Sequence, residues 1–151
     1  MTPELRDSYK IDRTGWASGP WDGEPDRIDF THAGLNCLML RARSGHWCGY
    51  AGLPPTHKLH GKDYWGVDVD CHGGLTYADA CAGNICHVPA PGEPEHLWWF
   101  GFDCHHSNDM APEDTTERMR QFAWGRGGSY RDAGYVRRQT ERLAEQLKEL
   151  N

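Results

Sequence analysis

The segment 97–103, Leu-Trp-Trp-Phe-Gly-Phe-Asp, constrains the fold of this chain more than any other stretch of its sequence. Aromatic residues favour the pleated, half-buried surface of a sheet, so the segment predicts a core strand. The polar sequence Cys-His-His-Ser-Asn-Asp follows at once, at positions 104–109. The pattern therefore predicts a strand that leaves the core and ends in a loop rich in metal-binding side chains.

Other stretches supply partners for this strand. Residues 35–41 predict a buried strand, and residues 47–53 predict its neighbour, which the following prolines end. A hairpin turn at Ser44-Gly45 would join the two. We expect shorter strands at 67–70, where apolar and acidic residues alternate, and at 85–88.

The C-terminal part of the chain predicts helices. Residues 131–150 place Val136, Leu143, Leu147 and Leu150 on one stripe among charged residues, and Pro112 to Gly125 can form a shorter helix. The expected fold class is α+β: a mostly antiparallel sheet of about four to six strands, with long ordered loops and C-terminal helices against one face. We expect a single domain over residues 1–151, with residues 1–12 as a loosely held N-terminal lead-in.

Charge and composition narrow the classes of partner. The chain has 151 residues and a net charge of -6, and its basic residues are spread along it, which does not favour nucleic acid. An apolar run of about 18 residues, as a membrane span needs, is missing. The N-terminus has no signal-peptide pattern, so we expect a cytoplasmic protein. In that compartment the six cysteines would be reduced thiols or ligands rather than a disulfide framework.

The first candidate for chemistry is the stretch from Val67 to Tyr77, in which a strand would deliver His72 to its end. The two glycines that follow, Gly73 and Gly74, let a backbone approach a ligand closely or present amides to an anion. A similar strand and His-Gly-Gly sequence occurs in α/β-hydrolases, but the chain lacks their Gly-x-Ser-x-Gly elbow. The alternative is a tight turn with a hydrogen-bonded histidine.

The second candidate is the polar run that begins at Asp103. Its histidines and cysteine favour zinc, whereas its Asp and Asn oxygens suit a harder ion. Asp103 can also act as a carboxylate that orients a histidine ligand. The alternative is a surface loop that carries a pair of histidines.

The third candidate is Cys81-Ala-Gly-Asn-Ile-Cys86-His87. Cys86 and His87 are adjacent, so only one of them can face a site from a strand. Cys81, Cys86, Cys104 and a histidine could close a structural zinc site, but buried, inert thiols remain the alternative. Cys48 with His72 is a further, less favoured option, as a nucleophilic pair.

Several motifs together resemble a family of small, mostly uncharacterised proteins of actinobacteria, other bacteria and their phages. The resemblance extends from residue 15 to about residue 110 and continues at Tyr130-Arg-Asp and Tyr135-Val136. Its main motifs are Gly19-Pro-Trp-Asp-Gly-Glu-Pro-Asp26, Trp47-Cys-Gly-Tyr50, His72-Gly-Gly-Leu-Thr-Tyr77, Ile85-Cys-His87 and Trp98-Trp-Phe-Gly-Phe-Asp-Cys104 with His106. It implies a phage or mobile-element accessory protein of the bacterial cytoplasm, for which small nucleotides are plausible ligands.

These motifs lead to one main hypothesis, a zinc-dependent hydrolase of a small polar or nucleotide-like substrate. The expected zinc ligands are His72, His87, Asp103 and His106, and the expected catalytic residues are His72, Asp103 and His106. Substrate contacts are expected from Gly73, Gly74, Thr76, Tyr77 and Trp98.

Two other functions stay open at this point. The chain could bind a small nucleotide without turnover, by stacking its Trp and Tyr rings on a base, with the pocket formed within a homo-oligomer. It could also be a protein-interaction or inhibitor module, with its acidic surface and exposed aromatic residues as the interface.

Overall fold

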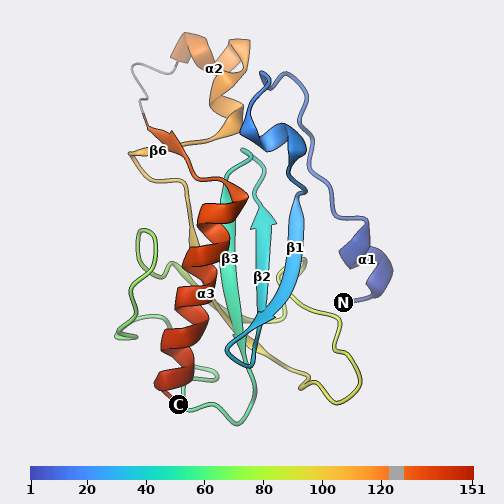
Figure 1. The fold of residues 1–151 in the computed structure, drawn as a ribbon, viewed down its shortest axis with the longest axis vertical. Helices are drawn as coiled ribbons and strands as arrows, with labels where there is room; N and C mark the ends of the chain where they lie inside the picture. Colours follow the sequence, from blue (N-terminus) through green and yellow to red (C-terminus); the bar gives the residue numbers. More distant parts are fainter. Residues whose placement is uncertain (123–127) are drawn as a thin grey trace.

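A computed structural model describes residues 1–122 and 128–151, and it confirms the α+β fold class. The main sheet has five strands in the order β1-β2-β3-β5-β4, and every neighbouring pair is antiparallel. A long C-terminal helix lies across this sheet (Figure 1). The strands are β1 (Arg27–His32), β2 (Leu35–Arg41), β3 (Trp47–Leu53), β4 (Tyr77–Ala80) and β5 (Trp98–Asp103).

The centre of the sheet follows the predictions closely. β2 and β3 form the expected hairpin, in which Leu40 lies opposite Cys48, and β5 pairs with the other side of β3. β2 and β3 are buried along nearly their whole length, because both faces of the sheet are covered. β1 joins β2 through Ala33-Gly34, whose positive φ angles of 53° and 77° suit a tight two-residue hairpin turn.

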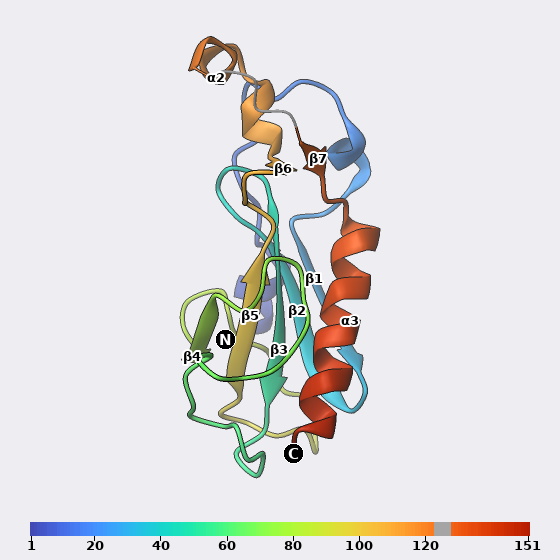
Figure 2. The same cartoon turned by 90° about the vertical axis from the view of Figure 1, so that its left-hand side faces the viewer.

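Helix α3 (Ala133–Glu149) covers one face of the sheet (Figure 2) and confirms the predicted C-terminal helix. The Asp132 side chain caps its first turn by accepting a hydrogen bond from the Tyr135 amide. The stripe that packs on the sheet is Val136, Thr140, Leu143, Ala144 and Leu147. No helix in the described ranges is long and apolar enough to cross a membrane.

Loops and the N-terminal segment cover the opposite face of the sheet (Figure 2). Residues 1–12, the predicted lead-in, contain the short helix α1 (Pro3–Asp7). The Tyr9 hydroxyl donates to the backbone oxygen of Arg41, and the Ile11 amide donates to Asp26. Tyr9 also packs against the apolar cluster on this face, together with Tyr77 and Ile85.

Two short strands were predicted where the structure has none. Residues 67–70 form a loop that packs beside α3. The Asp70 carboxylate pairs with Arg142 there, and the Asp70 backbone oxygen accepts a hydrogen bond from the Gln146 side chain. The alternation there reflects one side of a loop packed on a helix. Residues 86–88 are also irregular, and Ile85 makes only an isolated bridge with Ala82.

The segment after β5 holds shorter elements than predicted. They are β6 (Asp109–Met110), the 3-10 helix η2 (Pro112–Thr115), α2 (Glu117–Phe122) and β7 (Ser129–Tyr130). The last residues of the predicted helix at 112–125 lie outside the described ranges. A further 3-10 helix, η1 (Pro20–Gly23), lies in the N-terminal loop. β6 and β7 pair in parallel next to the first turn of α3, at the end of the molecule where α2 lies (Figure 2).

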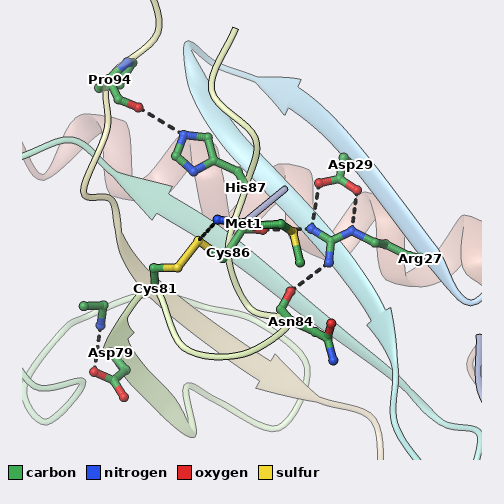
Figure 3. Close-up of a disulfide and its surroundings, with 10 residues drawn as sticks. Met1, Arg27, Asp29, Asp79, Cys81, Asn84, Cys86, His87 and Pro94 are labelled. Atoms are coloured by element: carbon green, nitrogen blue, oxygen red, sulfur yellow. Dashed lines mark hydrogen bonds and ion pairs between the residues drawn. A yellow bond between two sulfur atoms is a disulfide. The ribbon is translucent and has the colours of Figure 1, made fainter. Parts of the chain in front are cut away.

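The expectation of six reduced cysteines is wrong for Cys81 and Cys86, which form a disulfide with a Cα–Cα distance of 4.7 Å (Figure 3). The turn closed by the Ala82–Ile85 bridge brings the two residues together. The disulfide also excludes the structural zinc site that would have used both thiols. Arg27, on the far edge strand β1, donates to the backbone oxygens of Asn84 and Cys86, so the loop spans this face of the sheet.

Candidate metal centre

Three side chains from two segments of the chain converge beside the first turn of α3: His72, His106 and Asp109. His72 belongs to the loop before β4, His106 follows β5, and Asp109 begins β6. One ligand atom from each residue lies within 4.8 Å of the other two. This cluster can hold a metal ion.

His72 is fixed at both ring nitrogens. Its Nε2 atom lies 2.8 Å and 3.0 Å from the two carboxylate oxygens of Asp109. Its Nδ1 atom lies 2.8 Å from the hydroxyl of Tyr135, which comes from the first turn of α3. The ring orientation is therefore set from outside the cluster, with Nε2 directed inwards.

Asp109 is the centre of the cluster, and only 1% of its side chain is exposed. Its Oδ2 atom accepts from the backbone amide of His106 at 2.9 Å, and its Oδ1 atom accepts from Nε of Arg131 at 2.9 Å. Burial alone would raise the pKa of this carboxyl. The hydrogen bonds from His72, Arg131 and the His106 amide outweigh burial and hold the pKa of Asp109 well below its usual range, so the residue is an anion.

His106 is the most accessible member, with 37% of its side chain exposed. Its Nδ1 atom lies 3.1 Å from Oδ2 of Asp109, and its Nε2 atom lies 3.7 Å from Oδ1 of Asp103. Asp103 is itself held, because the Thr76 hydroxyl and the His105 amide both donate to it. The cluster is thus buried on the Asp109 side and open on the His106 side.

The contact between Gly73 and His106 explains why a glycine follows His72. Its φ angle is 69°, and a Cβ atom built there would lie 2.2 Å from Cε1 of His106. The imidazole of His106 therefore lies directly against the Gly73 backbone. Gly74 has a similar φ of 81°, but a Cβ there would meet nothing within 4 Å. Gly73 therefore leaves room for the His106 ring, whereas Gly74 is needed only for the positive φ angle of the turn.

Gly73→Ala and Gly74→Ala form a matched pair of tests. Each should cost about 1–2 kcal/mol of stability, because an alanine is disfavoured at positive φ. Only Gly73→Ala displaces His106, so only this variant should also lose metal affinity, by about 10- to 100-fold. Urea unfolding and metal titration of both variants check this prediction. Equal metal affinities in the two variants would contradict it.

A second pair of histidines lies beside the cluster. The rings of His46 and His105 stack with centroids 4.3 Å apart, and the Ser44 hydroxyl lies 2.6 Å from Nδ1 of His46. Burial, and then the neighbouring His105, lower the pKa of His46 to about 4. His46 is therefore neutral at pH 7, and it adds no positive charge to the surroundings of the cluster.

Several predicted site residues come together here. His72 and His106 belong to the cluster, Gly73 contacts His106, Thr76 donates to Asp103, and Gly74 completes the turn after Gly73.

Three predicted site residues do not join the cluster. His87 hydrogen-bonds to the backbone oxygen of Pro94 (Figure 3), and its ring packs on Trp99. Tyr77 packs its ring against Tyr50. Trp98 starts β5, the strand that ends at Asp103, and donates to the backbone oxygen of Lys62.

The free thiols are poor candidates for chemistry. Burial, followed by the nearby charge of Asp103, raises the pKa of Cys48 to about 12, so the thiol stays protonated. This argues against its use as a nucleophile with His72. Cys104 lies next to the polar run, but it is buried in the core that faces α3, and burial raises its pKa as well.

Sequence reasoning missed three members of the site. Asp109 was part of the polar run, and its spacing of three residues from His106 was an available signal. Arg131 and Tyr135 carry no such signal, because only the packing of α3 brings them to His72 and Asp109.

Comparisons with family models, with curated proteins and with solved structures found no match to this chain.

Proposed function

We propose that the protein is a metal-dependent hydrolase, with zinc held by His72, His106 and Asp109, that acts on a small polar or nucleotide-like substrate. One observation carries the proposal. Each of the three residues directs one ligand atom to a common point, and its other polar atom lies near an outer partner. These partners are Tyr135 for His72, Arg131 for Asp109 and Asp103 for His106. Oriented ligands of this kind are typical of catalytic zinc sites.

The donor set suits zinc. Two imidazoles and one carboxylate are a known combination for catalytic zinc, and three protein ligands leave a fourth position for water. Tetrahedral bonds of about 2.1 Å place ligand atoms about 3.4 Å apart. Asp109 Oδ2 lies 2.8 Å from His72 Nε2 and 3.1 Å from His106 Nδ1, so side-chain shifts of a few tenths of an ångström accommodate the ion.

Asp103 has a different role in this proposal from that of a ligand. It faces Nε2 of His106, whereas the ligand atom of that ring is Nδ1. Asp103 therefore orients His106 and increases the basicity of its imidazole, as carboxylates behind histidine ligands do. Of the two roles that the sequence left open for Asp103, the geometry supports this one.

The open side of the cluster leaves room for a water molecule and a substrate beside the metal position. A zinc ion held by His72, His106 and Asp109 would lower the pKa of a bound water to about 7 and so supply a nucleophile at neutral pH. The protein holds the ligands in place and leaves the His106 side accessible to a substrate. The phage or mobile-element setting implied by the motifs remains part of this proposal.

Removal of the metal tests the proposal directly. Purified protein should contain about one zinc per chain, and it should hydrolyse at least one member of a panel of phosphoesters, amides and nucleotides. A chelator should abolish this hydrolysis, and stoichiometric zinc should restore it. Full hydrolysis in metal-free protein would contradict the proposal, whereas tight ligand binding without turnover would favour a non-catalytic binding protein.

The compartment is a separate part of the proposal. We propose a cytoplasmic location, yet disulfides persist mainly in oxidising compartments, and Cys81–Cys86 is a disulfide here. A thiol count on protein isolated from its native host under acid quench tests this part. Six free thiols would agree with a reducing compartment, and four would contradict it.

A further inference from the structure

We propose that Arg131 binds a phosphoryl group of the substrate, next to the metal. The inference rests on the proposed hydrolase function and specifies its substrate class, a small phosphate ester. Arg131 belongs to the Tyr130-Arg-Asp motif, but sequence reasoning assigned it no role; it lies directly before Asp132, the cap of α3.

Among the described residues, the guanidinium of Arg131 is hydrogen-bonded only through its Nε atom. Its Nε atom donates to Oδ1 of Asp109 at 2.9 Å, and its plane lies over the ring of Tyr135, with the central carbon 5.3 Å from the ring centroid. Within residues 1–122 and 128–151, neither of its two terminal Nη groups has a hydrogen-bond acceptor. The Arg131 side chain is 26% exposed, so it is accessible to a ligand.

This arrangement matches the geometry of an oxyanion anchor. A guanidinium offers parallel N–H donors that fit two oxygens of a phosphate. Contacts with Asp109 and Tyr135 fix the plane of Arg131, so little conformational entropy is lost when the ligand binds. Arg131 contacts Oδ1 of Asp109 and the ion would lie beside Oδ2, so the anchor and the ion would share one carboxylate.

The charges at the site favour an anionic substrate. Arg131 is a permanent cation, as arginine side chains in proteins are. A permanent cation beside a metal-binding carboxylate weakens the affinity for the ion. With zinc bound, the charges of the ion and of Arg131 would together exceed those of the Asp109 and Asp103 carboxylates. An anion that bridges Arg131 and the metal compensates this excess.

If Arg131 had only a structural role, its replacement would have a different effect on anion binding. If it only neutralised Asp109, replacing it would disturb the carboxylate without a specific effect on anions. If it is an anchor, Arg131→Gln should weaken phosphate binding much more than zinc binding. The change in zinc affinity should be the smaller one, because the loss of an orienting hydrogen bond to Asp109 and the loss of a repelling charge act in opposite directions.

The test uses inorganic phosphate as the probe and the zinc-loaded full chain. Calorimetric titration should show phosphate binding to wild type, and a 10- to 100-fold weaker Kd in Arg131→Gln, the size expected of charge-assisted hydrogen bonds. Arg131→Lys should fall between the two, because it keeps the charge without the paired donors. Arg138→Gln, an exposed arginine on α3, serves as the matched control and should bind as wild type does.

The outcomes separate this inference from the proposed function. Zinc binding with equal phosphate affinity in wild type and Arg131→Gln would overturn the role of Arg131. Zinc binding without phosphate binding, or with preferential binding of acetate, would overturn the substrate class and leave the metal site intact. A failure to bind zinc at all would overturn the hydrolase proposal itself, and a parallel zinc titration reports this independently.

Discussion

The His72→Ala protein should lose its bound zinc and all measurable hydrolysis while it keeps its fold. The substitution removes one of three ligands, and loss of an outer partner alone typically costs about 10- to 100-fold in metal affinity. We therefore expect zinc affinity to fall by more than about 100-fold. The fold should survive, because Asp109 retains the hydrogen bonds from Arg131 and from the His106 amide. Zinc titration and circular dichroism measure the two effects.

His60→Ala is the control for this variant. His60 lies in the loop after β3, and its ring contacts Trp98 and the backbone oxygen of His96, away from the cluster. It should bind zinc with wild-type affinity. If His72→Ala and His60→Ala both retained zinc and hydrolysis, His72 would not be a ligand.

Arg41→Met should lower the free energy of unfolding by about 3–5 kcal/mol. The Arg41 side chain is fully buried, and it pairs with Asp26 at 3.0 Å and with Glu24 at 3.3 Å. Its removal would leave both carboxylates without that charge, and breaking a buried pair costs more than the pair contributes. Arg41 also donates to the Gly45 backbone oxygen and to the Tyr130 hydroxyl.

Urea unfolding of Arg41→Met measures the loss, and Arg43→Met is the matched control. Arg43 is exposed and only two residues along the chain, so its replacement should change stability by less than about 0.5 kcal/mol. Similar stabilities of the two variants would show that the Arg41 network is not a main support of the fold.

The sequence predicted the elements that contribute long apolar or aromatic segments to the core. The aromatic run at 97–103 and the apolar stripe at 131–150 are long enough to identify a strand and a helix, and the structure confirms both. The alternation at 67–70 was too short for this, because four residues on the side of a loop can show the same pattern. β4 and β1 were not predicted, since edge strands are half exposed and carry mixed polarity.

Of the residues in the cluster, only the two histidines could be predicted from the sequence. His72 and His106 stand in motifs with chemistry of their own: Gly73 follows His72, and His106 lies three residues from both Asp103 and Asp109. His87 also stands in such a motif, but the disulfide loop that precedes it places it against Trp99. The parallel pairing of β6 and β7 brings Arg131 to Asp109, a contact that no local pattern encodes.

Diffraction from crystals grown with zinc, recorded at the zinc absorption edge, tests whether His72, His106 and Asp109 bind the metal. We predict one strong anomalous peak, about 2.1 Å from His72 Nε2, His106 Nδ1 and Asp109 Oδ2. An empty cluster in such crystals, with His72 still hydrogen-bonded to Asp109, would contradict this prediction.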